Sequence, residues 1–483
     1  MRRFSLWLLA TVCVASGCTL HPEPLPDLAL SGQPFRHSKT ALSTQPVGES
    51  SVLGAPLNWV SLFNDPQLTK MVEAALKGNL EIKSANARIQ QSRALLDLDR
   101  AYTLPTVQTG PSFSRDRVSG TVDEALPQRT LHNWTVPVDF SYDVDVWGRL
   151  RGGVESARNN LLSVQADSDA VKLRVSTEVA SDYLTLRFVD FDRTELLRSI
   201  ALRQMALDLI QRRVKAGSAG DLDALRATTE LKTASAELEE SDRLRENLVD
   251  SIAVLSGMSV TDLHLENRQD DVVVPQVPVD LPSVILENRP DVYAAQRRLD
   301  AASLQIGIAK TAFLPSLTLT ASGGFASDSL RTFLDRNSSM WGLGISVVET
   351  LFDGGRRQSA VDSAKASYLI AEADYHVTAL QALRQVQDAL NDIEAQGLQA
   401  DDYAAASTAS SQAAALSRSR YDHGYVSYFE VVDSDRSALA IKRQLIRAHQ
   451  AQAVATVSLL RALGGGWNGI HPPIQPSAIA GEP

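Results

Sequence analysis

The 483-residue chain has little cysteine, few aromatic residues and no excess of basic residues. It contains 2 Cys, 6% aromatic residues, and 47 Lys and Arg against 57 Asp and Glu, for a formal net charge of −10. Nucleic acid is disfavoured as a partner, because a surface that follows phosphates needs clustered Lys and Arg. Only one apolar run, at the N-terminus, approaches membrane length, which argues against a polytopic helical membrane protein. The length exceeds one ordinary compact domain, so we expect several domains or one elongated architecture.

The usual sequence signs of catalysis and of metal binding are also missing. The eight His residues have no metal-ligand spacing. We find no nucleophile elbow, phosphate loop or pair of catalytic carboxylates. The sequence therefore predicts a protein that is not an enzyme and that uses no metal or cofactor.

Residues 1–17 have the zones of a secretory signal peptide: two arginines, an apolar run and small residues at the end. The segment Ala15-Ser16-Gly17-Cys18 resembles the bacterial lipobox, in which the cysteine becomes the lipidated first residue of the mature chain. Cys13 would leave with the signal, so the mature chain could form no internal disulfide. We expect a covalent N-terminal lipid on Cys18. Ordinary cleavage nearby, with Cys18 left as a thiol, is the alternative.

Two segments are expected to lie outside the folded body. Residues 18–56 are rich in Pro, Gly, Ser and Thr, a composition that stays extended, and we interpret them as a tether from the lipid anchor. Residues 466–483 are rich in Gly and Pro and are expected to form a flexible tail.

An internal repeat sets the expected architecture, with one copy at 57–270 and a second at 271–465. A Leu-Pro pair, a Gly-Arg boundary and a Gly-containing turn recur in the same order in both copies. These landmarks are Leu104-Pro105 and Leu314-Pro315, 210 residues apart, then Gly148 and Gly355, and Gly217 and Gly424, each pair 207 apart.

Each copy is expected to run from a helix, through two strands, into a long helical hairpin. The first helices, over about 66–101 and 283–312, should stop at the Leu-Pro pairs, which cannot continue a helix. The first long helical run, about 148–216, would be roughly 100 Å long at 1.5 Å per residue, and 3-4 spacing predicts a coiled-coil seam. The predicted strands are about 104–117, 133–147, 314–327 and 339–352, and the predicted hairpins are 148–256 and 356–463.

The clearest strand alternates apolar and polar residues over 135–146. Its polar side includes Asp139, Asp143 and Asp145, which we predict to face a lumen while the apolar side faces lipid. A calcium site at Asp143 and Asp145 is the less favoured interpretation. Four such strands cannot close a barrel, and an open edge in a bilayer leaves backbone groups unpaired. Closure must come from other copies of the chain, and a dimer or a trimer would both reach the smallest bacterial barrels of about eight strands.

The whole pattern over about 57–465 resembles the outer membrane efflux protein family, the TolC-like outer-membrane factors, and in particular the lipoprotein branch that serves tripartite drug exporters. The duplicated order, the Leu-Pro pairs, the segments Trp147-Gly148-Arg149 and Asp353–Arg356, and the Gly turns carry the resemblance. It implies a mixed α and β membrane protein: a homotrimer with a 12-stranded transmembrane barrel in the outer membrane, continuous with a long helical coiled-coil barrel in the periplasm. It also implies a periplasmic adaptor and a proton-driven inner-membrane pump as partners.

The resemblance further implies a periplasmic aperture at the second hairpin tip. By motif position, Phe429 would form an apolar ring, Asp433 and Glu430 acidic rings, and Tyr421 a link between helices. Some relatives have Arg where Val426 stands, so this chain lacks the arginine that a charge latch at that position would need. As local alternatives, Glu430 could complete a capping box with Ser427, and Asp433 could pair with Arg436 on a solvated face.

The tip turns are predicted at Gly217, Gly220 and Gly424, and the tips are the expected docking surface for the adaptor. We expect Asp221 to be a helix N-cap rather than a gate.

The function we predict is that of a passive outer-membrane channel, which conducts drugs or other small compounds from an inner-membrane pump to the exterior. A type I secretion conduit and a metal efflux channel use similar tunnels and stay open as alternatives. A lipid-anchored coiled-coil spacer without a pore is the alternative from the structural class.

Overall fold

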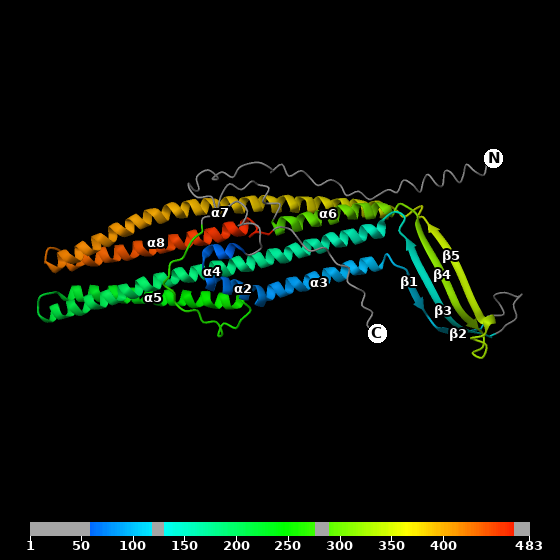
Figure 1. Ribbon diagram of the computed structural model, residues 1–483, viewed down its shortest axis with the longest axis horizontal. Helices are drawn as coiled ribbons and strands as arrows, with labels where there is room; N and C mark the ends of the chain where they lie inside the picture. The colour runs from blue at the N-terminus through cyan, green and yellow to red at the C-terminus, as the bar shows by residue number, and fades with distance from the viewer. Residues whose placement is uncertain (1–57, 118–129, 276–288, 468–483) are drawn as a thin grey trace.

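The computed structural model describes residues 58–117, 130–275 and 289–467. It is an elongated molecule, with a bundle of long helices at one end and a small sheet at the other (Figure 1). The mixed α and β fold class is confirmed. The predicted signal peptide, the lipid on Cys18 and the tether lie outside the described residues.

Two long helical hairpins make up most of the length. In the first, α4 (Arg149–Lys215) turns into α5 (Asp221–Leu255), and in the second, α7 (Arg356–Asp422) turns into α8 (Tyr428–Ala462). The two longer helices have 67 residues each, which corresponds to about 100 Å. Both hairpin tips lie at the end of the molecule that is farthest from the sheet (Figure 1). None of the described helices combines the length and the apolar character that a membrane crossing requires.

The shorter helices differ from the expected single helix at 66–101. A 3-10 helix, η1 (Asn58–Phe63), precedes α2 (Pro66–Gly78) and α3 (Leu80–Ala101). The chain breaks at Asn79, whose side chain accepts from the amides of α3 and donates to the Leu255 carbonyl over 2.8 Å. In the second copy α6 spans Pro290–Thr311, and the part of the predicted helix before residue 289 lies outside the described residues. Both α3 and α6 end before their Leu-Pro pairs, as expected.

The sheet contains four lines of strand. Its segments are β1 (Thr106–Thr109), β2 (Ser112–Arg117), β3 (Thr130–Val144), β4 (Ser316–Ser327) and β5 (Ser339–Val348), with the 3-10 turn η3 (Arg336–Ser338) before the last. The order is β1-β3-β4-β5, all antiparallel, and β2 also pairs with β3.

The first predicted strand, 104–117, is interrupted rather than continuous. Thr109 pairs with Val138 and Ser112 pairs with Thr135, so β1 and β2 keep one register on β3 with no residue inserted. The interruption falls at Gly110 and Pro111, and proline has no N–H to donate to a ladder. The two segments are therefore one strand line in two pieces.

The register gives the sheet one polar and one apolar face. On the polar face, Ser141 lies between Thr106 and Thr320, and Asp143 lies beside Thr318. On the apolar face, Phe140 lies between Val107 and Ala321. Along β5 the apolar side chains are almost fully exposed: Trp341 81%, Leu343 79%, Ile345 75% and Val347 67%. Nothing in the described chain covers this face, so its apolar surface is available to an apolar surrounding.

The seam between α4 and α6 is built from smaller residues than the predicted 3-4 pattern. Of that pattern Leu161, Ser168 and Val175 are buried, but the side chains of Val154 and Val164 are only half-buried. Small polar residues take the buried positions, and the Ser156 hydroxyl donates to the Ala301 carbonyl over 3.3 Å. Small side chains allow the two helix backbones to approach closely.

The main apolar core lies midway along the molecule, where η1, α2, α4 and α8 meet. Trp59 and Phe63 are 2% exposed and belong to one buried cluster with Val179 of α4 and Val457 of α8. The predicted flexible tail begins too early at 466, because Trp467 is held in place. Its indole Nε1 donates to Asp169 over 3.1 Å and its ring packs against Tyr293.

A buried ionic network adjoins this core. Asp65 caps α2 by accepting from the Gln67 amide, and it also accepts from the Tyr183 hydroxyl at 2.9 Å, from Arg187 at 3.1 Å and from Arg268 at 3.0 Å. Burial alone would raise the pKa of Asp65, but these hydrogen bonds outweigh it and hold the pKa below its ordinary value. The network ties α2 and α4 to the segment around residue 268.

Replacing Asp65 by Asn should lower the free energy of unfolding by roughly 2 to 3 kcal/mol at pH 7, since it removes the charged partner of two arginines. The folded pKa of Asp65 lies below 3.8, so its charge stabilises the protein above about pH 4 and this contribution is lost as the pH falls through the folded pKa. Chemical unfolding in detergent should therefore show a difference that narrows below pH 4. Asp388→Asn, which breaks an exposed pair, is the control and should change stability by under about 0.5 kcal/mol. A difference that is the same at pH 3 and pH 7 would contradict the assignment.

Candidate functional site

The two hairpin tips share the same turn geometry. Gly217 has φ 69° and Gly424 has φ 78°, values in the left-handed region that favours glycine. In each tip the glycine amide bonds to the carbonyl three residues earlier, and the next amide bonds to the carbonyl five residues earlier. This is the Schellman arrangement that ends a helix and reverses the chain.

Gly220 has a different role from the other two glycines. Its φ is −88° and it is the N-cap of α5, so its backbone would accept other residues. The expectation that Asp221 is the N-cap is wrong, because Asp221 is the first residue of the helix and no side chain caps it. Its carboxylate still lies in the first turn, where the positive end of the helix dipole stabilises the negative charge.

Tyr421 and Phe429 both contact arginines of the opposite hairpin. The Arg213 guanidinium lies over the Tyr421 ring at 5.1 Å, and that of Arg226 lies over the Phe429 ring at 5.2 Å. Each contact is a cation–π interaction between the first and second tips. Neither arginine was predicted as a tip contact from the sequence. Phe429 remains 55% exposed, so much of its ring is free to meet another surface.

The predicted acidic residues lie at the start of α8. Glu430 is in its first turn, but Ser427 makes no side-chain cap, so the capping-box alternative is wrong. Asp433 does pair with Arg436 at 3.3 Å, with both side chains at least 60% exposed. An exposed pair of this kind contributes under about 1 kcal/mol. Neither carboxylate is therefore fixed by a buried structural role.

Tyr428 holds the two tips together and was not predicted. It is 8% exposed and belongs to a cluster with Val431 of its own helix and four residues of the first hairpin: Leu207, Ile210, Ala227 and Leu231. Burial, with the nearby Asp435, raises its pKa to about 12. The Tyr421 ring lies 5.6 Å from the Tyr428 ring. In the sequence, Tyr428 could have been singled out only as the apolar neighbour of Phe429.

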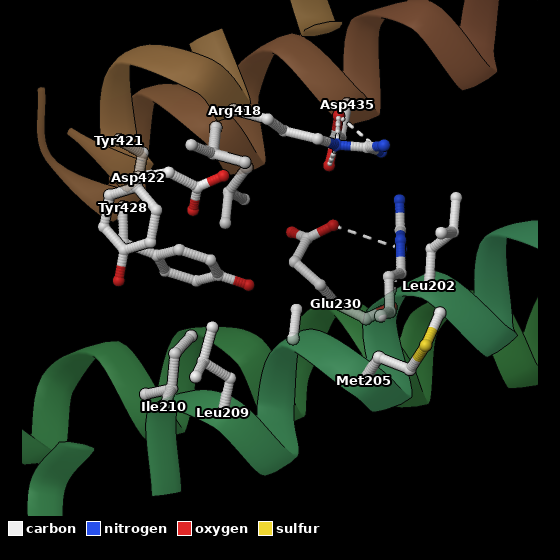
Figure 2. Close-up of a pocket in the computed structure, with 14 residues that line it drawn as sticks. Leu202, Met205, Leu209, Ile210, Glu230, Arg418, Tyr421, Asp422, Tyr428 and Asp435 are labelled. Atoms are coloured by element: carbon white, nitrogen blue, oxygen red, sulfur yellow. Dashed lines mark hydrogen bonds and ion pairs between the residues drawn. The ribbon is translucent and has the colours of Figure 1, made fainter. Parts of the chain in front are cut away.

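A cavity of about 210 Å³ lies between the two hairpins, next to this cluster. Figure 2 shows Leu202, Met205 and Glu230 on one wall, and Arg418, Tyr421 and Asp435 on the other. Each wall carries an ion pair within its own hairpin. Arg203 pairs with Glu230 at 3.2 Å, and Arg418 pairs with Asp435 at 2.9 Å. Ion pairs thus stay inside each hairpin, while the contact across the hairpins near the tip is apolar and aromatic.

Farther from the tip, one arginine joins the hairpins directly. Arg443 of α8 pairs with Asp192 of α4 at 2.7 Å and with Glu237 of α5. Arg443 joins the hairpins by ion pairs, as the cluster at Tyr428 joins them by apolar contacts. Neither could be predicted from local sequence, because the partners lie in different copies of the repeat, at least 197 residues apart.

Of the predicted lumen carboxylates, Asp139 and Asp143 lie on the polar face of β3 and Asp145 does not. Asp143 accepts from the Thr318 hydroxyl at 2.9 Å. Asp145 lies beyond the end of β3 and accepts from the amides of Leu150 and Arg151, so it anchors the start of α4. Its assignment to the lumen was wrong because the strand ends earlier than the alternation suggests.

Asp353 repeats this device before α7. Its carboxylate accepts from the amides of Gly355 and Arg357.

Within the described residues, no group of three or more His, Cys, Asp or Glu side chains is placed to hold a metal ion.

Comparison with known proteins agrees with this architecture. The model of the outer membrane efflux protein family matches residues 71–257 and 281–465. The toluene efflux pump outer membrane protein TtgF of Pseudomonas putida is 28% identical over 475 residues, which cover 96% of this chain and 97% of that protein. Two similar solved structures, each 25% identical, are the outer-membrane channel OprN, with a TM-score of 0.85 over 93% of this chain and 99% of that one, and VceC of Vibrio cholerae, with 0.79 over 86% and 100%.

Replacing Gly424 by Ala should destabilise the second tip by about 1 to 2 kcal/mol, because Ala resists the left-handed conformation. Hydrogen exchange of the turn amides should then accelerate by about 5- to 30-fold, with the helices near the sheet unaffected. Gly220→Ser is the control. Its φ is ordinary, an added Cβ would meet nothing within 4 Å and serine is a favoured N-cap residue, so exchange at the first tip should not accelerate. Equal effects of the two substitutions would refute the distinction.

Proposed function

The chain belongs to the outer membrane efflux protein family and is the outer membrane channel component of an efflux system, and on this premise we propose that three copies close into one conduit. The barrel part spans the outer membrane and the helical part extends through the periplasm. Transport is passive: a pump in the inner membrane supplies the energy, and no step at the channel involves covalent chemistry.

The sheet carries this proposal. Its apolar face runs along β3 from Trp134 to Val144, ten residue steps, or about 33 Å of strand. At the tilt of about 40° found in membrane barrels, that length spans about 25 Å, the height of the apolar band of outer-membrane barrels. The lines β1/β2 and β5 are the two edges of the sheet within the described chain. In a bilayer the groups on these edges need a partner, and the edge of another copy supplies it.

The helices offer matching edges for a threefold assembly. Near the sheet, neighbouring helices follow the order α3-α4-α6-α7, which leaves α3 and α7 at the two sides. Both carry exposed apolar residues: Leu95 and Leu98 on α3, and Leu369, Ile370 and Val377 on α7. Packing α7 of one copy against α3 of the next buries both rows. Three copies of four strand lines then give twelve strands around one lumen.

The aperture lies at the second tips, where three copies would bring Phe429, Glu430 and Asp433 around the axis. Three rings of this kind narrow the tunnel with aromatic side chains and line it with carboxylates. Carboxylates that converge on one axis repel one another and attract cations, so the closed state is narrow and prefers cations. A periplasmic adaptor docks at the tips and loosens the contacts between hairpins, and the partner pump is proton-driven.

The cargo is a drug or another small compound, and the lipid on Cys18 adds a second attachment to the outer membrane. A conduit for secreted peptides or for metal ions would use the same tunnel, with the selectivity supplied by the pump.

Reconstitution in planar bilayers should give small, cation-selective single-channel currents. Phe429→Ala should increase the conductance severalfold by removing the apolar ring, and Asp433→Asn should lower the preference for cations by removing three charges from the axis. Leu222→Ala is the control, because Leu222 is the second residue of α5 as Phe429 is the second residue of α8. It should leave the conductance unchanged.

Absence of any current from wild type and from both variants would favour the non-conducting spacer. Currents that change equally in the Leu222 and Phe429 variants would place the constriction elsewhere.

Cells that express the Cys18→Ser variant should lose all labelling of this protein by a fatty-acid probe, because the thioether and amide lipids both depend on that residue. Cys13→Ser is the matched control and should label normally, since Cys13 is removed with the signal peptide. Labelling that persists in the Cys18 variant would show that the lipid is attached elsewhere or is not attached in this way.

A further inference from the structure

An aromatic pair marks the end of the apolar band at the far end of the sheet. Phe113 of β2 and Trp134 of β3 are directly opposite in the register, and their ring centroids are 4.3 Å apart. His132 stacks on the other side of Phe113 at 6.2 Å. All three belong to the face that carries Val136 and Val138. Aromatic residues of outer-membrane barrels gather where hydrocarbon gives way to headgroups.

Two arginines continue the same face beyond the aromatic pair. Arg115 lies opposite His132, and Arg117 lies opposite Thr130. Side chains alternate along a strand, so Phe113, Arg115 and Arg117 project to one side, at intervals of about 7 Å. The tips of β2 and β3 are at the end of the molecule away from the helices (Figure 1). With the helices in the periplasm, these arginines lie at the level of the outer-leaflet headgroups.

These two charges have no counter-charge in the described part of the chain. Asp116, which lies between them in sequence, projects to the opposite face, where it accepts from the Ser114 hydroxyl at 2.9 Å. Neither Arg115 nor Arg117 forms an ion pair within residues 58–117, 130–275 and 289–467, and both are exposed. Guanidinium groups that have no ion-pair partner among the described residues, on a lipid-facing surface, favour an anionic partner in the lipid.

We propose that Arg115 and Arg117, with His132 beside them, bind the phosphate groups of a phosphorylated outer-leaflet glycolipid. This inference rests on the membrane orientation of the proposed function. The guanidinium fork matches the geometry of a phosphate, and two forks about 7 Å apart suit a headgroup with more than one phosphate. The ring of Phe113 and the indole of Trp134 contact the acyl boundary just below.

The position of Arg115 and Arg117 on the face of the sheet excludes a neighbouring subunit as their binding partner. Another copy joins the sheet through backbone groups at the edges of β1/β2 and β5, in the plane of the sheet, and leaves the face free. The apolar band directly below the arginines faces hydrocarbon, so the surface that continues it meets the headgroups of the same lipids. The charge and the position thus point to lipid phosphate rather than to a protein.

The test uses the full-length protein in phosphatidylcholine nanodiscs that contain diphosphoryl lipid A as the probe. Native mass spectrometry counts the lipid A molecules that stay bound, and a titration gives the apparent affinity. Arg115→Gln with Arg117→Gln should weaken retention at least about tenfold, which is the loss expected for charge-assisted contacts. Arg115→Lys with Arg117→Lys keeps the charge and should restore most of it. Monophosphoryl lipid A should bind the wild type more weakly than the diphosphoryl form.

The control is Arg88→Gln with Arg93→Gln, which removes the same charge from exposed positions on α3. It should retain lipid A as the wild type does. Equal retention by the two Gln variants, or equal loss in both, would overturn the proposal. Planar-bilayer currents of the same preparations test the conduit separately from the lipid site. Normal currents with lost lipid A in the Arg115 and Arg117 Gln variant support the site. Normal currents with normal retention refute the site and leave the conduit standing. A wild type that gives no currents and no retention would refute the membrane orientation itself.

Discussion

Unpaired backbone groups along the two edges of the sheet are the constraint on which the rest of the structure depends. In water such edges can bond to solvent, but in hydrocarbon each unpaired group costs several kcal/mol, so a few of them exceed the net stability of a typical protein. The apolar face along β5 places the sheet in hydrocarbon and thereby makes the edges intolerable for a single chain. The proposed assembly of three copies meets this constraint, and in it the exposed apolar rows on α3 and α7 serve the same closure.

The duplication gives both halves of the chain the same architecture, while differences between the copies give the two tips their different chemistry. Both copies keep the Leu-Pro stop, the aspartate that anchors the long helix and the left-handed glycine at the tip. The tips differ in chemistry. Arg226 of the first tip is 207 residues before Asp433 of the second, so the same place in the fold holds a cation in one copy and an anion in the other. Because the first copy has Arg226 at this place rather than a carboxylate, its guanidinium can lie over the ring of Phe429.

Periodicity predicted the parts that depend on local sequence. Helix length, strand alternation and the glycine turns depend on residues that are close in sequence. The long hairpins accordingly lie within a residue or two of their predicted bounds. Asn79 was missed because its break depends on the distant Leu255 carbonyl, and Asp145 was misplaced because alternation continues past the last strand pair. Tyr428 and Arg443 act through partners in the other copy of the repeat, which no local pattern reveals. The aperture residues came from family resemblance, and their arrangement around an axis stays a prediction.

The distribution of contacts favours the proposed opening at the tips with the barrel unchanged. The apolar core and the Asp65 network lie midway along the molecule, and Arg443 joins the hairpins between that core and the tips. Beyond Arg443, the hairpins meet through the small cluster at Tyr428 and the cation–π pairs of Arg213 and Arg226. The ion pairs at Arg203 and Arg418 are internal to each hairpin and survive their separation. In the proposed opening, weak apolar and aromatic contacts near the cavity break and the ion pairs within each hairpin stay intact, so a docked adaptor would need to supply only a few kcal/mol.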